Sequence, residues 1–305
     1  MSSNKIECSD CGRIYEESEL EICAGEHPKE KRSEVSEIHL NEPSLEGELD
    51  VGEFTHYYFN KVYISPQVDE TKLTFKNKSR RVKIIKLVEG QQYLDRHHST
   101  KQKREKITNL DASRKLLEGN LDLTDFINLK ELDFSCNKLV SLNLTNCQKL
   151  EKIVCSDNLL TKLILPTNPA NLKTLDLRNN NFPTQDLSFL ELYTNLECLH
   201  LENKNEEKIK RGIYNRFTGS LNHLSGMKQL KYLNIGNTDI NEVDIDKLPS
   251  SLRKGDFWGV EGFEKIRRST SKRPNCELTQ IVPQLKRFGY YGHCQKCQQL
   301  NTSIK

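Results

Sequence analysis

The sequence predicts an α/β repeat solenoid with short strands on one side, an extended or irregular far side, and a few inserted helices. Three observations carry this prediction. A Leu-x-x-Leu-x-Leu-x-x-Asn-x-Leu pattern recurs every 21 or 22 residues, a half-period echo follows its first copies, and helical spacing is confined to short segments. One such turn cannot bury its own apolar side, so consecutive turns must stack.

The full pattern begins at Leu129, Leu150 and Leu172, and its strand portion returns at Leu196 and Leu230. A fixed period of this size with Leu and Asn in these slots is the leucine-rich repeat. The fourth and sixth slots point inward from a short strand, and the residues beside them face solvent. The Asn of the ninth slot lies where the chain leaves the strand, and its amide can satisfy buried backbone groups.

The half-period echoes begin at Leu139 and Leu160, each 10 residues after the start of a main copy, and the next main copy follows Leu139 by 11 residues. This spacing is too short for each half of the repeat to contain a helix plus two connecting turns. We therefore expect the far side to be extended. Cys147 occupies the ninth slot of an echo and Cys155 an inward Leu slot, so both are predicted to be core cysteines.

A second regularity duplicates part of the N-terminal half. Residues 29–54 align without gaps to residues 101–126, at an offset of 72, with 9 of 26 positions identical. We expect a degenerate leucine-rich repeat block over residues 29–87 and the main block over residues 107–260. Residues 88–106 interrupt the strand pattern and predict a connector helix between the two blocks.

One insertion breaks the period of the main block. Residues 205–217 place apolar side chains at helical spacing, with acids in the first turn where the helix dipole favours them. We expect a helix near 205–217 that packs against one edge of the solenoid.

Charge is unevenly distributed, although the net charge is only +3. Residues 1–28 form an acidic, Cys-containing segment, and residues 261–305 form a basic tail that ends in a Cys-x-x-Cys knuckle. Residues 72–106 carry twelve basic against three acidic side chains. This pattern is consistent with solvated faces, with steering of an acidic partner, or with self-association, and the sequence leaves the oligomeric state open.

The cellular context follows from what the sequence contains. No apolar run approaches the roughly 20 residues that cross a bilayer, and the start has no secretory pattern. Ten cysteines without a signal segment favour a reducing compartment. We expect a cytoplasmic protein with no membrane contact, and keep the nucleus as an alternative.

Three runs resemble a set of fungal leucine-rich repeat proteins: residues 117–123, 179–189 and 205–217. The resemblance covers about residues 88–305, and the insertion is its most specific part. In some members the repeats precede a zinc-ribbon-like segment and a kinase-like domain, and residues 288–302 resemble the start of that ribbon. The chain has no kinase glycine loop, His-Arg-Asp or Asp-Phe-Gly motif. The resemblance therefore implies a repeat region without its effector, either a truncated paralogue or an incomplete gene model.

Two Cys pairs are candidate zinc ligands. Cys294 and Cys297 have the spacing of half a tetrahedral site, and Cys8 and Cys11 form a second pair. Cys23 and His27 could complete the N-terminal set, but the 72-residue duplication aligns this stretch with the connector helix instead. Zinc is thus an alternative to a protein without a cofactor.

The sequence shows no nucleophile elbow, phosphate loop or paired-carboxylate pattern, so we expect no catalytic residue and no enzyme activity. Candidate partner-binding residues lie in two outward strand columns, with Arg178 beside the second. The first column is Glu131, Lys152, Thr174, Cys198 and Tyr232, and the second is Asp133, Val154, Asp176, His200 and Asn234. Mixed polar columns with one aromatic suit a protein or peptide better than nucleic acid, which favours basic residues interleaved with aromatics.

The primary hypothesis is thus a non-catalytic, protein-binding scaffold that uses the strand face of the repeats. One alternative is the truncated regulatory region of a kinase-like protein. Another is a zinc-dependent nucleic-acid binder that uses the basic stretch of residues 76–83.

Overall fold

The computed structural model describes residues 5–7, 14–16, 37–40, 47–53, 61–210, 212–257 and 259–260. The chain divides into two compact units. Unit 1 consists of Met1–His97 with Lys115–Gly119, and unit 2 consists of His98–Arg114 with Asn120–Lys305.

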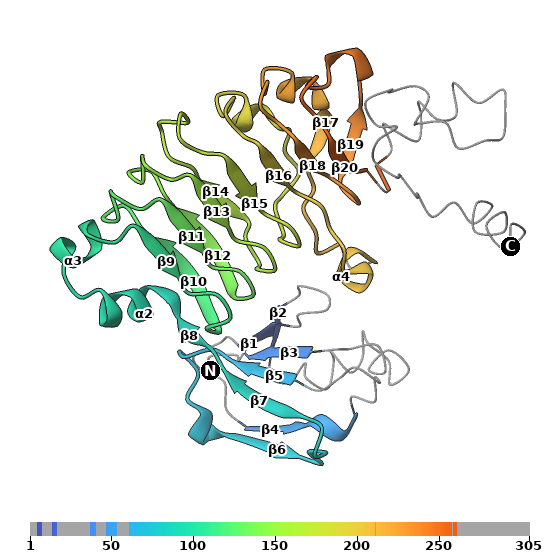
Figure 1. The fold of residues 1–305 in the computed structure, drawn as a ribbon. Coiled ribbons are helices and arrows are strands. Elements are labelled where there is room, and N and C mark those ends of the chain that lie inside the picture. Colours follow the sequence, from blue (N-terminus) through green and yellow to red (C-terminus); the bar gives the residue numbers. More distant parts are fainter. Residues whose placement is uncertain are drawn as a thin grey trace, which may run out of the picture. The chain divides into compact units, whose positions relative to one another are not determined.

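Unit 2 is a leucine-rich repeat solenoid. Its main sheet contains seven parallel strands in the order β20-β18-β16-β15-β13-β11-β9 (Figure 1). The strands are β9 Asn109–Asp111, β11 Glu131–Asp133, β13 Lys152–Val154, β15 Thr174–Asp176, β16 Cys198–His200, β18 Tyr232–Asn234 and β20 Lys254–Asp256. Each strand pairs in register with its neighbour, so the fold class predicted from the period is confirmed.

The far side of unit 2 is extended where the half-period echoes predict it. β12 Lys138–Asn143 lies between β14 Lys162–Ile164 and β10 Leu117–Asp122 in a second parallel sheet. Further along, β17 Thr218–Ser220 and β19 Asp239–Glu242 form a parallel pair. Short 3₁₀ helices complete the later turns: η5 Ser188–Leu190, η6 Leu221–Leu224 and η7 Ile245–Lys247.

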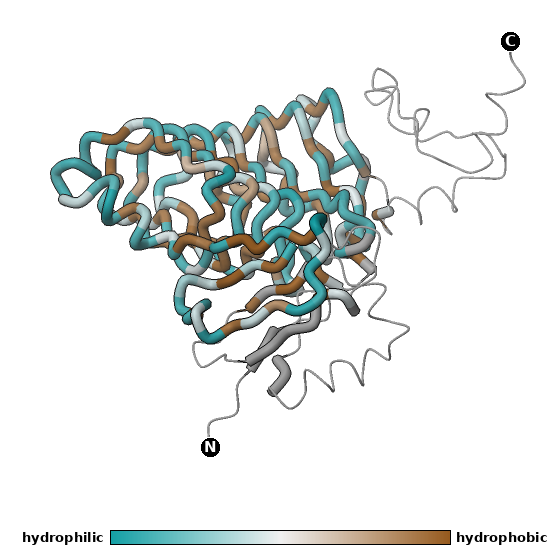
Figure 2. Tube along the Cα trace, turned by 90° about the horizontal axis from the view of Figure 1, so that it is seen from below, coloured by the Kyte–Doolittle hydropathy of each residue, from teal (hydrophilic) through white to brown (hydrophobic). Residues whose placement is uncertain are grey.

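The core of unit 2 is a stack of inward side chains. The middle residue of each of the main-sheet strands β11, β13, β15, β16 and β18 is at most 1% exposed, as in Leu132, Ile153 and Leu175. Figure 2 shows apolar positions recurring along the turns with hydrophilic positions between them. Each turn buries its apolar side against the next, as a repeat array requires.

A ladder of asparagines connects successive turns. Asn158 Nδ2 donates to Cys155 O in its own turn at 3.2 Å and to Phe134 O in the preceding turn at 2.9 Å, while its Oδ1 accepts from Leu139 N at 3.1 Å. Asn180 repeats this arrangement one turn later. Both side chains are buried, so these bonds satisfy backbone groups that water cannot reach.

The ladder continues through a residue of the insertion. The ninth slot of the fourth copy holds the exposed Lys204, which cannot play this role. Asn215 takes its place: its Nδ2 donates to Leu177 O at 2.8 Å and to Leu201 O at 3.0 Å, and its Oδ1 accepts from Phe182 N at 3.5 Å. Asn215 is fully buried. The insertion therefore supplies a structural part of the solenoid.

The two predicted helical segments are shorter than the sequence suggests. Residues 88–106 contain β8 Val88–Glu89 followed by two helices, α2 Gly90–His97 and α3 Lys101–Glu105. Thr100 separates them because its extended backbone and its hydroxyl, which accepts from Lys103 N at 3.3 Å, begin a new helix.

In the insertion, α4 spans only Glu206–Lys210 rather than 205–217. Gly212 follows it in the left-handed region at φ 77°, and Asn215 and Phe217 are fully buried in the solenoid. The helical prediction fails there because the chain must leave the helix to carry Asn215 into the ladder. No helix in the described part of the chain is long and apolar enough to cross a membrane.

Unit 1 repeats the same plan on a smaller scale. β3 Glu37–Leu40, β5 Lys61–Ile64 and β7 Lys83–Lys86 are parallel and in register, and β4 Gly47–Asp50 pairs with β6 Leu73–Lys76. The antiparallel strands β1 Lys5–Glu7 and β2 Ile14–Glu16 extend the first sheet beside β3. η3 Val51–Glu53 and η4 Glu70–Lys72 are 3₁₀ turns, and β8 pairs with Leu117 and Glu118 of β10.

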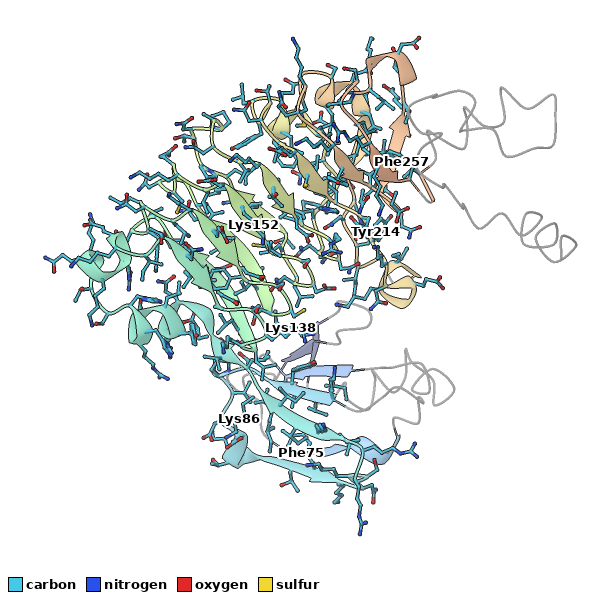
Figure 3. The ribbon with its side chains drawn as sticks, in the orientation of Figure 1. Phe75, Lys86, Lys138, Lys152, Tyr214 and Phe257 are labelled. Atoms are coloured by element: carbon cyan, nitrogen blue, oxygen red, sulfur yellow. The ribbon has the colours of Figure 1, made fainter. Side chains whose placement is uncertain are left out.

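The duplication is visible in this arrangement. β3 begins at residue 37 and β9 at residue 109, which is the 72-residue offset of the sequence alignment (109 − 37 = 72). Ile38, Leu40, Val62 and Ile64 are central members of the core of unit 1. Figure 3 places Phe75 on β6 at the side of this core, and it packs against the core although it is only partly buried.

Replacing Asn215 tests the ladder. Asn215→Ala removes the donor of two buried carbonyls and the acceptor of Phe182 N, so we expect the free energy of unfolding to fall by about 2–3 kcal/mol. Urea denaturation followed by circular dichroism measures this change. Asn195→Ala is the matched control, because Asn195 donates to Ala170 O from an exposed position, and its effect should stay within about 0.5 kcal/mol. Equal losses in both variants would contradict the structural role of Asn215.

Candidate partner-binding face

The two outward columns predicted from the sequence lie in neighbouring rows of the main sheet. Strand pairing places Glu131 beside Lys152 and Asp133 beside Val154, and the same register continues to β18. The sheet extends both rows beyond the prediction, through Asn109, Asp111, Lys254 and Asp256. We refer to the solvent-facing side of β9 to β20 as the strand face.

The first row is the more accessible one. Glu131, Lys152 and Tyr232 are exposed, and Tyr232 keeps 41% of its surface in water. Thr174 and Cys198 of the same row are half-buried. Lys152 is labelled in Figure 3 in the middle of this face. Among the described residues, Glu131 and Lys152 make no ion pair, so both charges are free to contact a partner.

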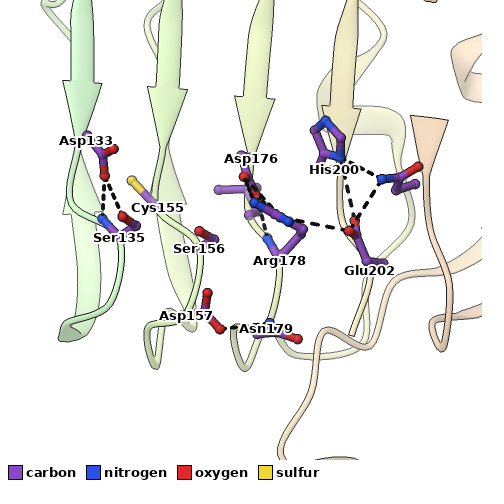
Figure 4. Close-up of polar contacts among 12 residues, drawn as sticks. Asp133, Ser135, Cys155, Ser156, Asp157, Asp176, Arg178, Asn179, His200 and Glu202 are labelled. Atoms are coloured by element: carbon purple, nitrogen blue, oxygen red, sulfur yellow. Dashed lines mark hydrogen bonds and ion pairs between the residues drawn. The ribbon is translucent and has the colours of Figure 1, made fainter. Parts of the chain in front are cut away.

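Asp133 in the second row has no cationic partner among the described residues. Asp133 Oδ1 accepts from Ser135 N at 2.9 Å and from Ser135 Oγ at 2.7 Å (Figure 4). Both bonds use one oxygen. The local turn therefore orients the carboxylate, and Oδ2 stays uncommitted.

Asp176 points outward but is not freely available. It is only 6% exposed, because Arg178 covers it with bonds from Nη2 to Oδ2 at 2.6 Å and from Nε to Oδ1 at 2.9 Å. These hydrogen bonds to Asp176 raise the pKa of Arg178 above its ordinary value. The two residues therefore present one neutral pair, with the guanidinium outermost.

Glu202 is the member of this face that the column pattern missed. It follows β16 in the seventh slot, where the three earlier copies have Ser135, Ser156 and Arg178, and it is fully buried. Lys204 Nζ lies 3.3 Å and Arg178 Nε 3.8 Å from Glu202 Oε1, and Asn234 Nδ2 donates to the same oxygen at 3.4 Å. The available signal was an acid in the slot that holds Arg178 one copy earlier, which puts opposite charges on neighbouring turns.

His200 and Asn234 of the second row lie against this carboxylate. His200 Nδ1 is 2.9 Å from Asn234 Nδ2 and 3.9 Å from Glu202 Oε2. The structure thus brings Asp176, Arg178, His200 and Asn234 into one polar network. Asp133 and Val154 lie on the neighbouring strands without joining it.

Asp157 adds a further carboxylate at the end of β13. Its backbone is in the left-handed region at φ 58°, and Cys136, Asn179 and Asn237 have the same conformation in the eighth slot of other copies. Asn179 Nδ2 donates to Asp157 Oδ1 at 2.8 Å, and no cation lies within ion-pair distance of Asp157 among the described residues.

Two of the described cysteines, Cys147 and Cys155, are buried core residues. Burial raises the pKa of the Cys155 thiol, with Asp176 and Asp133 adding to the shift, and burial raises the pKa of Cys147 to about 12. Cys147 Sγ donates to Leu123 O at 3.2 Å. Neither thiol can act as a nucleophile near neutral pH.

The described residues contain no cluster of three or more His, Cys, Asp and Glu side chains with metal-site geometry. Cys8, Cys11, Cys294 and Cys297 lie outside the described residues, as do Cys23 and His27. Zinc binding by these pairs stays a prediction, which elemental analysis of the purified protein tests.

Comparison with known proteins gives structural matches only. No protein-family model matches the sequence, and no curated protein matches it significantly. A leucine-rich repeat protein of Leptospira interrogans is 19% identical, with a TM-score of 0.46, and the match covers 87% of this chain and 67% of that one. The complex of PEPR1 with AtPEP1 gives the same identity and TM-score over 80% of this chain, but this chain spans only 30% of that protein. InlJ from Listeria monocytogenes is 16% identical, with a TM-score of 0.40, over 77% of this chain and 56% of InlJ.

Alkylation tests the assignment of the cysteines. With its pKa near 12, Cys147 is about one part in ten thousand thiolate at pH 8. We expect iodoacetamide to modify the exposed Cys136 in the native protein while Cys147 and Cys155 stay unmodified. Peptide mass spectrometry measures the extents, and all three should react in 6 M guanidinium. Fast labelling of Cys155 in the native state would contradict its place in the core.

Proposed function

We propose that this chain is a non-catalytic scaffold whose strand face binds a protein or peptide partner. The observation that carries the proposal is the in-register row of side chains along seven parallel strands, in which Glu131, Lys152 and Tyr232 are exposed. Such a row offers charged contacts beside an exposed tyrosine, and tyrosine is one of the residue types that most often anchor protein interfaces. The buried thiols and the self-bonded Asp176–Arg178 pair offer no reactive group. We place the protein in the cytoplasm and assign it no cofactor.

The resemblance to fungal repeat proteins supports one refinement. In that setting the strand face would belong to the regulatory region of a kinase-like protein, with Cys294 and Cys297 at the junction to the effector. The genomic sequence beyond Lys305 tests this refinement, because the refinement predicts an open reading frame there with a second Cys pair and a kinase glycine loop.

A nucleic-acid role is favoured by one feature of unit 1. Lys78, Arg80, Arg81 and Lys83 are all exposed around the turn between β6 and β7, and none makes an ion pair with a described residue. Nucleic-acid binding through these residues would weaken steeply with salt. Lys86, in the same strand as Lys83, is paired with Glu70 instead (Figure 3). The strand face of unit 2 lacks such a basic row, so we rank protein binding first.

A triple substitution tests the strand face. Glu131→Ala, Lys152→Ala and Tyr232→Ala remove three exposed side chains, so the free energy of unfolding should change by less than about 1 kcal/mol. We expect capture of the partner from cell lysate, measured by quantitative mass spectrometry, to fall at least tenfold, because tyrosine is a frequent interface hot spot and the variant also loses two exposed charges of the row.

The matched control replaces three exposed residues of the far side, Asn120→Ala, Val140→Ala and Lys162→Ala. This variant should capture the partner as the unmodified protein does. If the strand-face variant retained every captured protein, the proposed function would be wrong.

A further inference from the structure

The strand face carries more negative charge than its own cations neutralise. Asp133, Asp157, Asp176 and Glu202 come from four consecutive copies of the repeat, and we call these four residues the acidic array (Figure 4). Arg178 and Lys204 are the cations within ion-pair distance of the array among the described residues. Two carboxylates, those of Asp133 and Asp157, are left without a counterion in this part of the chain.

Glu202 shows where the array lacks a partner. Its side chain is 1% exposed. Lys204, Arg178 and Asn234 all approach Oε1, whereas Oε2 has no hydrogen bond in the described structure. A buried polar atom is nearly always bonded in folded proteins, and leaving a charged one unbonded is costly. An unbonded carboxylate oxygen beneath a binding face is therefore an acceptor available to a ligand.

The side chains that cover Glu202 are themselves partly exposed. His200 is the group nearest to Oε2, at 3.9 Å from Nδ1, and 25% of its side chain is in contact with solvent. Lys204 is 54% exposed. Because both side chains border water, they can move aside without unfolding the turn. A cation that replaces them would reach Oε2 from the strand face.

We propose that the acidic array binds a basic side chain of an extended protein segment, with arginine as the preferred residue; this inference rests on the proposed function. A guanidinium has five donors in a planar fork and can bond both a carboxylate and a neighbouring oxygen, whereas an ammonium acts as a compact point charge. Arg178 already shows this geometry on Asp176 in the same network.

The array also sets the spacing of a second basic residue. Asp133 on β11 and Glu202 after β16 are separated by three strand intervals in the sheet order, which is about 14 Å at roughly 4.8 Å per interval. An extended segment rises about 3.3–3.6 Å per residue. Two arginines about four positions apart would therefore reach Glu202 and the free pair of Asp133 and Asp157 together.

Synthetic peptides test this inference without knowledge of the natural partner. The probe is a labelled ten-residue Gly/Ser peptide with two arginines four positions apart, and its matched versions carry lysine or glutamate instead. Fluorescence anisotropy at low ionic strength should show binding of the arginine peptide, weaker binding of the lysine peptide and none of the glutamate peptide. Equal or tighter binding of the glutamate peptide would overturn the proposal.

Substitutions then locate the site. Glu202→Gln and the pair Asp133→Asn with Asp157→Asn should each weaken the arginine peptide at least tenfold. Glu151→Gln, at a carboxylate paired with Lys173 outside the array, should change it less than twofold. His200→Ala should preserve or strengthen binding because it uncovers Oε2. That result separates a lost contact from a damaged fold, in which binding would fall in every variant. Unchanged binding in Glu202→Gln refutes the assignment.

Two further results distinguish this inference from the proposed function. If the triple strand-face variant loses its natural partner while the array substitutions leave binding of the arginine peptide unchanged, the strand face binds a partner but the acidic array is not the site that binds basic residues. If magnesium or calcium ions displace the arginine peptide at stoichiometric amounts, the array is a metal site and the peptide assignment is wrong.

Discussion

The asparagine ladder holds the turns of unit 2 in one register. Each turn leaves buried backbone groups where its strand ends, and a turn alone has nothing to pair with them. Asn158 and Asn180 meet this requirement by bonding a carbonyl of their own turn and one of the preceding turn. Slipping one turn past another would break these bonds, so the inward leucines stay stacked and the outward side chains stay in rows.

That constraint explains how much of the structure could be predicted from the sequence. Both outward rows follow from counting residues, because a fixed slot means a fixed place in the sheet, and the strand pairing agrees at every predicted position. The extended far side follows from the half-period in the same way. Periodicity reports which side chains are buried, and that is sufficient wherever the ninth slot of the copy holds the asparagine of the ladder.

Prediction failed where the ninth slot lacks the asparagine that bonds the buried backbone groups. The fourth copy has Lys204 in the asparagine slot, and its buried carbonyls are bonded instead by Asn215, eleven positions further along the chain. Helical spacing across residues 205–217 could not reveal this, because the spacing describes which side chains are apolar and not which backbone groups need hydrogen bonds. The helix ends early for that reason. Thr100 likewise divides the connector through a capping bond that the apolar pattern does not contain.

Glu202 is another residue whose contacts cannot be read from the apolar pattern, but its consequence concerns binding and not the backbone. Three of the five copies show that the seventh slot needs no charge, since Ser135, Ser156 and Gly236 occupy it there. Arg178 does not need Glu202 as a counterion either, because Asp176 already binds it through two of its nitrogens, at 2.6 and 2.9 Å, whereas Glu202 lies 3.8 Å away. The stack would therefore be complete with a small neutral residue in place of Glu202. Burying the Glu202 carboxylate costs stability, and the carboxylate is needed neither by the asparagine ladder nor by the Asp176–Arg178 ion pair. Glu202 does give the strand face a local negative charge. A basic segment would recognise the strand face by this charge.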